Sequence, residues 1–244
     1  MESDRKFFNS YEDDFRAKEY SKLEFQNTYY LAFRDLPEIF SSYVKGKKAI
    51  DFGCGTGRST RFLKKYGFET IGVDISKEMI SVAKKIDLLG DYRLIKDNDY
   101  KGLSKKSFDF ILSAFTFDNI PMAKKKELFS GLNQLLKKDG ILLNLVSSPE
   151  MYTYEWASFS TKDFPNNKYV KSGDVVPIIT TDFADKRPCY DIFCSDEDYK
   201  KIFSKVKLDL IDTLKPLANG NEPYNWVNET KIAPWTIYVL KKNF

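Results

Sequence analysis

The stretch that decides the fold is KAIDFGCGTGR, residues 48–58. A short apolar run around Ile50 meets three glycines at alternate positions, Gly53, Gly55 and Gly57, and a helical pattern follows. This order predicts a buried strand, a tight turn and a helix, because glycines let the backbone approach a ligand without a Cβ in the way. We therefore expect a ligand-binding turn at the end of the first strand.

A second acidic residue extends this site. Asp74 lies sixteen residues after Arg58, at the end of the apolar run Thr70-Ile71-Gly72-Val73. A carboxylate in this place can accept hydrogen bonds from both hydroxyls of a ribose, as it does in nucleotide-binding α/β folds. The ligand is therefore expected to contain a nucleoside.

The residues around the glycines distinguish between cofactors. A dinucleotide fingerprint reads G-x-G-x-x-G, and Arg58 stands where its third glycine would be. Asp51, two residues before the first glycine, would repel a pyrophosphate but suits an ammonium group. S-adenosylmethionine has a ribose, an ammonium and a sulfonium and no phosphate. The two acids therefore favour this cofactor, and they argue against a nicotinamide oxidoreductase.

Three segments together resemble one family. AIDFGCGTGRSTRFL (residues 49–63), ETIGVDIS (69–76) and SFDFILSAF (107–115) resemble the class I S-adenosylmethionine-dependent methyltransferases, specifically the small-molecule type. The resemblance implies an α/β, Rossmann-like fold with a seven-stranded, mostly parallel sheet, helices on both faces and an antiparallel last strand. The chain departs from the commonest pattern after the fourth strand, where a His is often found and this sequence reads Phe117-Asp118-Asn119. A mechanism based on histidine is excluded, because the chain contains none.

The expected organisation is one methyltransferase domain over residues 1–244, since a chain of this length forms a single α/β domain with a substantial core. Strand and helix signals alternate from residue 48 onward and then give way to a segment rich in proline and polar residues, which predicts an insertion after the fifth strand. The parts are an N-terminal helical flap (1–46), the cofactor-binding core (47–147), an insertion forming a substrate lid (148–195), and a C-terminal helix with edge strands (196–244).

The composition of the chain limits the kinds of partner that we expect it to bind. The net charge is only +4, and the lysines come mostly as scattered pairs, whereas a nucleic-acid surface would be more concentrated. The densest run, Lys124-Lys125-Lys126, is interpreted as the solvated start of a helix. Three cysteines without metal-ligand spacing predict reduced thiols and no metal site. The polar N-terminus does not read as a signal peptide, and no apolar segment is long enough to span a bilayer, so we expect a soluble, cytoplasmic protein.

Fourteen residues are expected at the cofactor. Ile75 and Met79 are candidates to pack under the adenine, and the resemblance implies an acid near the adenine amine, at Asp97 or Asn98, although Asp97-Asn98-Asp99 also reads as a plain turn. Arg58 either reaches the methionine carboxylate or points to solvent. The full set is Asp51, Gly53, Gly55, Gly57, Arg58, Asp74, Ile75, Met79, Asp97, Asn98, Ser113, Phe115, Tyr11 and Tyr20.

Two pairs in this set rest on their place in the fold. Ser113 and Phe115 lie at the carboxyl end of the fourth strand, which is expected over Phe108 to Ser113, and should face the crevice at that edge of the sheet. Tyr11 and Tyr20 belong to the N-terminal flap, whose aromatics otherwise pack against the core.

The sequence gives fewer signals for the residues that contact the methyl acceptor. Asp118 and Asn119 stand beyond the fourth strand, near the expected acceptor, although a capping acid before the next helix explains Asp118 equally simply. Tyr152 and Trp156 belong to an aromatic-rich insertion that either lines a lid over the substrate or forms its own small core. No residue is assigned as a catalytic base.

The predicted reaction is in-line transfer of a methyl group from S-adenosylmethionine to oxygen or nitrogen of a small-molecule acceptor. The sulfonium is already a good electrophile, so the protein mainly aligns the reactants, which lowers a barrier by roughly 7 to 11 kcal/mol. Two alternatives remain open: an RNA or tRNA methyltransferase on the same fold, and a protein that holds the cofactor without transferring its methyl group. The sequence leaves the oligomeric state open.

Overall fold

The computed structural model describes residues 14–96, 99–100, 102–182 and 184–243. Seven strands form one sheet in the order β3-β2-β1-β4-β5-β10-β9. Neighbours from β3 to β5 pair in parallel, whereas β10 runs antiparallel to both β5 and β9. The predicted fold class is therefore confirmed. The strands are β1 (Lys48–Phe52), β2 (Glu69–Asp74), β3 (Asp91–Leu94), β4 (Phe108–Ala114), β5 (Leu136–Ser147), β9 (Leu208–Leu214) and β10 (Trp235–Lys242).

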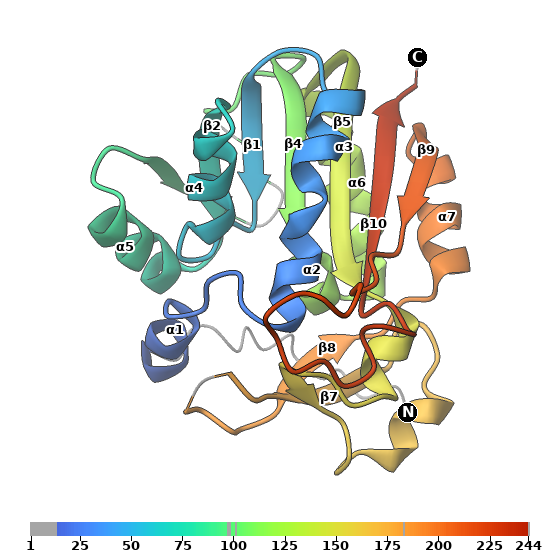
Figure 1. Cartoon of the computed structure of the whole chain (residues 1–244). Helices are drawn as coiled ribbons and strands as arrows, with labels where there is room; N and C mark the ends of the chain where they lie inside the picture. Colours follow the sequence, from blue (N-terminus) through green and yellow to red (C-terminus); the bar gives the residue numbers. More distant parts are fainter. Residues whose placement is uncertain (1–13, 97–98, 101, 183, 244) are drawn as a thin grey trace, which may run out of the picture.

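Helices cover both faces of this sheet (Figure 1). On one face, α2 (Thr28–Arg34), α3 (Leu36–Tyr43) and α4 (Arg58–Lys65) pack against one apolar cluster with the strands. On the other face, α6 (Met122–Leu135) and α7 (Asp196–Lys205) pack against a second cluster. Strand β4 lies between the two clusters, and its central residues are completely buried, which explains its nearly continuous apolar sequence.

Two of the helices begin at a serine cap. Helix α5 (Lys77–Ile86) packs on β2 and β3, and the Ser76 hydroxyl accepts a hydrogen bond of 3.2 Å from the Met79 N–H. Ser195 caps α7 in the same way, accepting a bond of 3.2 Å from the Asp198 N–H. Each serine satisfies a backbone donor that has no partner inside its helix. The cap at Ser76 matters for the site because it fixes the chain directly after Asp74.

The insertion after β5 lies beyond the carboxyl ends of the parallel strands (Figure 1). It contains two short helices and an antiparallel sheet in the order β6-β7-β8. Its elements are η3 (Pro149–Tyr152), β6 (Phe159–Ser160), η4 (Pro165–Tyr169), β7 (Val175–Thr180) and β8 (Cys189–Ile192). None of the described helices is both long and apolar enough to cross a lipid bilayer.

The first described helix, α1 (Asp14–Tyr20), is attached to this insertion. The Arg16 guanidinium pairs with the Asp185 carboxylate at 3.1 Å, and both side chains are buried. Glu19 accepts a hydrogen bond of 3.1 Å from the Ala184 N–H. The N-terminal helix and the insertion therefore form one continuous cover at the carboxyl edge of the sheet.

Candidate active site

The glycine turn between β1 and α4 has the left-handed backbone that glycine favours. Gly53 and Gly57 have φ angles of 73° and 85°. A Cβ on Gly53 would lie 2.1 Å from the Thr116 hydroxyl oxygen, and one on Gly57 would lie 2.5 Å from the Tyr92 hydroxyl oxygen. A Cβ on Gly55 would meet only Tyr20, at 3.8 Å. The turn is therefore packed tightly at its two ends and open at its centre, where a ligand can approach the backbone.

Asp74 joins this turn to the end of β2. One carboxylate oxygen accepts a hydrogen bond of 2.8 Å from the Gly55 N–H, and the other accepts one of 2.8 Å from the Ser76 N–H. Burial raises the pKa of Asp74, and the two backbone N–H donors oppose that rise. Because each carboxylate oxygen has a further lone pair, Asp74 can still accept hydrogen bonds from a ligand.

Asp51 is completely buried at the carboxyl end of β1. One carboxylate oxygen accepts hydrogen bonds of 2.7 Å from the Ser59 hydroxyl and 2.6 Å from the Thr60 hydroxyl. The other oxygen has no hydrogen-bond partner among the described residues. Burial raises the pKa of Asp51 to about 6. A buried carboxylate oxygen without a donor is costly, so it suits a ligand that brings its own donor.

A cavity of about 110 Å³ opens beside Asp74 and the glycine turn. Seven of its ten lining residues belong to the predicted cofactor set, and Asn119 was predicted at the substrate. Ala114 and Thr116 were missed, although both flank Phe115, which the same strand-end rule had selected. The lining residues are Tyr20, Gly53, Gly55, Asp74, Ile75, Met79, Ala114, Phe115, Thr116 and Asn119.

Arg58 does not point to solvent, which corrects one of its two predicted placements. Its side chain is buried, and its guanidinium lies 4.8 Å from the centre of the Tyr29 ring, with four further aromatic rings within 5.9 Å. It donates to the Glu24 carbonyl at 2.9 Å and to the Tyr20 hydroxyl at 3.3 Å. It also lines a small hollow with Gly53, Gly55 and Thr56, of about 20 Å³. Arg58 therefore lies at the inner end of the site.

Two predicted residues lie elsewhere than expected. Ser113 is fully buried within β4, between Phe52 of β1 and Asn144 of β5, and does not line the cavity. The strand continues one residue further than predicted, so the side chains that reach the crevice begin at Ala114. The Asp118 carboxylate accepts from the Ser147 N–H at 3.1 Å and does not line the cavity either. It ties the chain after β4 to the end of β5.

Tyr152 and Trp156 are buried in the apolar cluster that α2, α3 and α4 share with the sheet, and they are not on the surface of a lid. The Tyr152 hydroxyl donates to Asp191 at 3.1 Å, and the Trp156 indole N–H donates to the Met151 carbonyl at 2.9 Å. Each aromatic polar group already has a partner inside the insertion, and the two rings join the insertion to the core of the domain. Tyr11, Asp97 and Asn98 lie outside the described residues, so their roles stay predictions.

The prediction that Lys124, Lys125 and Lys126 are solvated was wrong at one position. Lys125 is completely buried, whereas Lys126 beside it is exposed. The local sequence did carry a signal, because Lys125 precedes Leu128, Phe129 and Leu132 at helical spacing and so falls on the apolar face.

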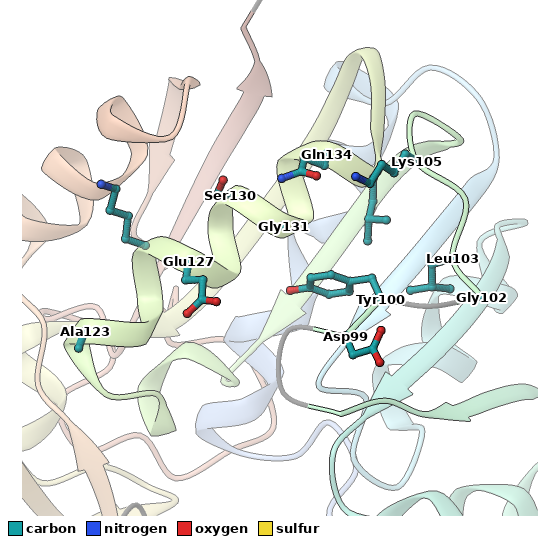
Figure 2. A pocket seen from close by; sticks show the side chains of 12 residues that line it. Asp99, Tyr100, Gly102, Leu103, Lys105, Ala123, Glu127, Ser130, Gly131 and Gln134 are labelled. Carbon is teal, nitrogen blue, oxygen red and sulfur yellow. The ribbon is translucent and has the colours of Figure 1, made fainter. Parts of the chain in front are cut away.

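A larger cavity lies elsewhere in the described part of the chain (Figure 2). It has a volume of about 790 Å³ and lies between α6 and the segment around Tyr100, with Glu127, Ser130 and Gln134 along one side of the helix. No residue of the glycine turn lines it, and neither Asp51 nor Asp74 does. The smaller cavity is therefore the one at which the predicted cofactor residues converge.

Comparison with known proteins agrees with this geometry. Residues 50–144 match a family model described as a methyltransferase domain, and this stretch contains the glycine turn, Asp74 and the chain after β4. An uncharacterized methyltransferase from Alkaliphilus oremlandii is 24% identical over 154 residues, which cover 57% of this chain and 70% of the relative. Residues 50–144 therefore form a methyltransferase domain, and these likenesses support a class I S-adenosylmethionine-dependent methyltransferase.

Two further likenesses place this methyltransferase among its relatives. The ubiquinone biosynthesis O-methyltransferase of Pelagibacter ubique is 28% identical over 151 residues, which cover 55% of this chain and 60% of the relative. A crystal structure of an S-adenosylmethionine-dependent methyltransferase from Clostridium acetobutylicum superposes with a TM-score of 0.64, covering 96% of each chain at 17% identity. The structural likeness shows the fold over nearly the whole chain, and the cofactor of this methyltransferase is S-adenosylmethionine.

Proposed function

We propose that this methyltransferase transfers the methyl group to an oxygen or nitrogen of a small-molecule acceptor by in-line displacement. The observation that carries the proposal is the cavity where Asp74, the glycine turn and the chain after β4 meet beside Tyr20 of the N-terminal helix α1. Methyl transfer from a sulfonium needs alignment of donor and acceptor more than it needs a strong base. A covered cavity at the end of the sheet supports that role.

The nucleoside half of the cofactor is assigned to the outer part of this cavity. Asp74 holds the ribose hydroxyls through the lone pairs that Gly55 and Ser76 leave available. Ile75, which is 48% exposed, and the buried Met79 line the same cavity and provide apolar contacts for the adenine.

The methionine half is assigned to the inner part. The unpartnered oxygen of Asp51 accepts from the ammonium group, since a charged donor makes the strongest hydrogen bond to a buried carboxylate. Arg58 takes the carboxylate, because no described carboxylate lies within ion-pair distance of its guanidinium and its present acceptors, a carbonyl and a phenol, are neutral. Both charged groups of the cofactor would then meet a group of opposite charge.

The cavity has to widen when the cofactor enters. Its volume of about 110 Å³ is below the range of roughly 300–1,000 Å³ in which protein pockets hold ligands of such size. Tyr20 is the side chain best placed to move, because it ends the short helix α1 and faces Gly55 across the cavity. We assign Tyr20 to the cover of the bound cofactor.

A small acceptor is favoured by the cover and by its aromatic wall. Tyr20 and Phe115 are the aromatic residues that line the cavity, and Phe115 is supported from behind by the buried Trp235, with ring centres 4.7 Å apart. Aromatic faces suit a flat or apolar acceptor and tolerate a nearby sulfonium. The Pelagibacter ubique relative is named for O-methylation in ubiquinone biosynthesis, which points to the same acceptor class. A net charge of +4 without a concentrated basic segment gives no comparable support for RNA.

The experiment is a methyl-transfer screen with cofactor labelled on its methyl group. The protein is incubated with a library of phenols, catechols, amines and carboxylic acids, and in parallel with total tRNA. Label is expected in at least one small acceptor and absent from RNA, and Asp74→Ala is the control for transfer that depends on the site. Label incorporated only into tRNA would overturn the small-molecule assignment.

A further inference from the structure

Helix α6 buries a charged side chain that the cofactor site does not explain. Lys125 has no exposed surface, and its ammonium donates a hydrogen bond to the Phe117 carbonyl. No described carboxylate lies within ion-pair distance of it. A buried charge without a paired countercharge is unfavourable, and an apolar residue of similar size at such a place is often neutral or stabilising. The lysine therefore calls for a role beyond packing.

The carbonyl that Lys125 binds belongs to the segment that shapes the cavity. Phe115, Thr116 and Asn119 line the cavity, and Phe117 lies between them in the chain. Phe115 has a φ of 62°, in the left-handed region that a bulky aromatic residue rarely adopts. Strained backbone of this kind persists only where its surroundings hold it firmly.

Neutral hydrogen bonds hold both ends of this segment. The Phe115 N–H donates to the Leu145 carbonyl at 2.8 Å, and the Thr116 hydroxyl donates to the Phe52 carbonyl at 2.9 Å. The Asn119 amide donates to the Phe115 carbonyl at 3.3 Å. These bonds fix the strained residue and its neighbour. In the middle of the segment the Asn119 N–H donates to the Thr116 carbonyl at 3.2 Å and the Ile120 N–H donates to the Phe117 carbonyl at 3.4 Å, so the Lys125 ammonium is the charged one of two donors to that carbonyl.

Four other groups face the Lys125 ammonium from three elements. Asp118 comes from η2 (Phe117–Asn119), Asp191 from β8 of the insertion, and Tyr199 from α7, with Cys194 just before that helix. The ammonium lies 5.5 Å from the centre of the Tyr199 ring, and β8 packs on η2. The Tyr199 hydroxyl has no hydrogen-bond partner among the described residues. Lys125 thus places a positive charge where residues 115–119 meet the insertion.

We infer that Lys125 is a positioning residue for the cofactor cavity. Its ammonium holds the Phe117 carbonyl so that Phe115, Thr116 and Asn119 keep the conformation that receives S-adenosylmethionine. The lysine itself touches neither the cavity nor the proposed ligand contacts. The inference rests on the proposed placement of the cofactor in this cavity.

The test compares Lys125→Met with Lys126→Met. Methionine removes the ammonium and keeps most of the apolar stem. Lys126 is the exposed neighbour, and it lines the larger cavity between α6 and Tyr100 instead of the cofactor cavity. Binding of S-adenosylhomocysteine is measured by calorimetry, thermal stability by melting, and order of residues 115–119 by amide hydrogen exchange. For Lys125→Met we expect affinity lowered by about tenfold or more and faster exchange in this segment, with a cooperative melting transition that shows the variant to be folded.

Each outcome of this experiment either supports or overturns the positioning role of Lys125. Equal affinity in the two variants overturns the positioning role. A failure of Lys126→Met itself to bind S-adenosylhomocysteine contradicts the proposed cofactor site, so the two failures are distinguishable. If Lys125→Met does not fold, Lys125→Ala with n-propylamine replaces it: recovery of affinity with the amine, but not with n-propanol, supports the role of the ammonium. Equal recovery with both, or none with either, overturns it.

Discussion

The Asp74 carboxylate accepts a hydrogen bond of 2.8 Å from the backbone N–H of Gly55, nineteen residues earlier in the chain. This bond joins the centre of the glycine turn to the end of β2, and the second carboxylate oxygen holds the Ser76 N–H at 2.8 Å. The acid therefore shapes the turn before any ligand binds and retains lone pairs that face the cavity. Structure and proposed ribose binding depend on the same side chain.

Asp74→Ala is expected to weaken binding of S-adenosylhomocysteine by at least about tenfold, equivalent to about 1.4 kcal/mol. The loss has two sources, because the variant removes both the ribose acceptor and the bond that orders Gly55. The measurement is calorimetry against Asp163→Ala, which changes an exposed aspartate in the insertion. An Asp74→Ala protein that binds as tightly as this control would remove Asp74 from the ribose role.

Asp51 makes the stability of the ligand-free protein depend on pH. Burial raises its pKa to about 6, above the ordinary value of 3.8. Between these values the folded protein keeps a proton that the unfolded chain has released, so the free energy of unfolding falls as the pH rises from about 4 to 6. Asp51→Asn should remove part of this decrease. Melting curves of both proteins across this range test it, and identical pH dependence would contradict the buried state of Asp51.

The same group predicts how ligand binding responds to pH. An ammonium group binds ionised Asp51, so the rise in melting temperature caused by S-adenosylhomocysteine should grow as the pH increases through 6. In Asp51→Asn this growth should be smaller, because the amide carries no charge at any of these pH values. A ligand-induced shift with the same pH profile in both proteins would assign the ammonium to another residue.

Much of this site was predictable because its signals are local. The strand, the three glycines and Asp51 lie within one stretch of the chain, and Asp74 ends the next strand. Parallel strands bring such carboxyl ends to one edge of the sheet, so neighbouring motifs meet without further information. Helix starts were predictable for the same reason, since the serine caps at Ser76 and Ser195 are read from the residues beside them.

The misplaced residues depend on contacts between distant segments. Whether Arg58 faces solvent is decided by the aromatic residues of α2 and the preceding turn, such as Tyr29, which fold over it. The burial of Tyr152 depends on Asp191 in a strand 39 residues away. Lys125 is the exception, because its helical spacing with Leu128 and Phe129 already placed it on the apolar face of α6. It was predicted to be solvated because lysine side chains are rarely buried.

Arg58→Met separates binding of the methionine half from binding of the nucleoside half. S-adenosylhomocysteine carries a carboxylate, whereas methylthioadenosine has the same nucleoside without the amino-acid group. We expect the variant to lose about tenfold or more in affinity for the first and little for the second, because a charged bidentate contact is removed from only one of them. Equal losses for both ligands would mean that Arg58 only supports the aromatic cluster around it.

The buried ion pair between Arg16 and Asp185 acts as a clasp between α1 and the insertion, and it should control how readily a protease cleaves the insertion. The two side chains are buried and pair at 3.1 Å, and Arg187 also donates to Asp185. Arg187 and Arg16 lower the pKa of Asp185, so the clasp contributes its full free energy of stabilisation above about pH 4, and this contribution declines in more acidic solution. Asp185→Asn leaves a buried guanidinium without its countercharge, which costs about 3 kcal/mol.

Limited proteolysis of residues 148–195 measures the effect of losing the ion pair between Arg16 and Asp185. Cleavage in Asp185→Asn is expected to be several-fold faster than in Asp163→Asn, whose aspartate lies exposed in the same insertion and makes no comparable pair. Because Tyr20 lies on the helix that this clasp holds, S-adenosylhomocysteine should slow cleavage in Asp163→Asn more than in Asp185→Asn. Equal cleavage rates in the two variants, with and without ligand, would show that the clasp does not join the N-terminal helix and the insertion into one cover.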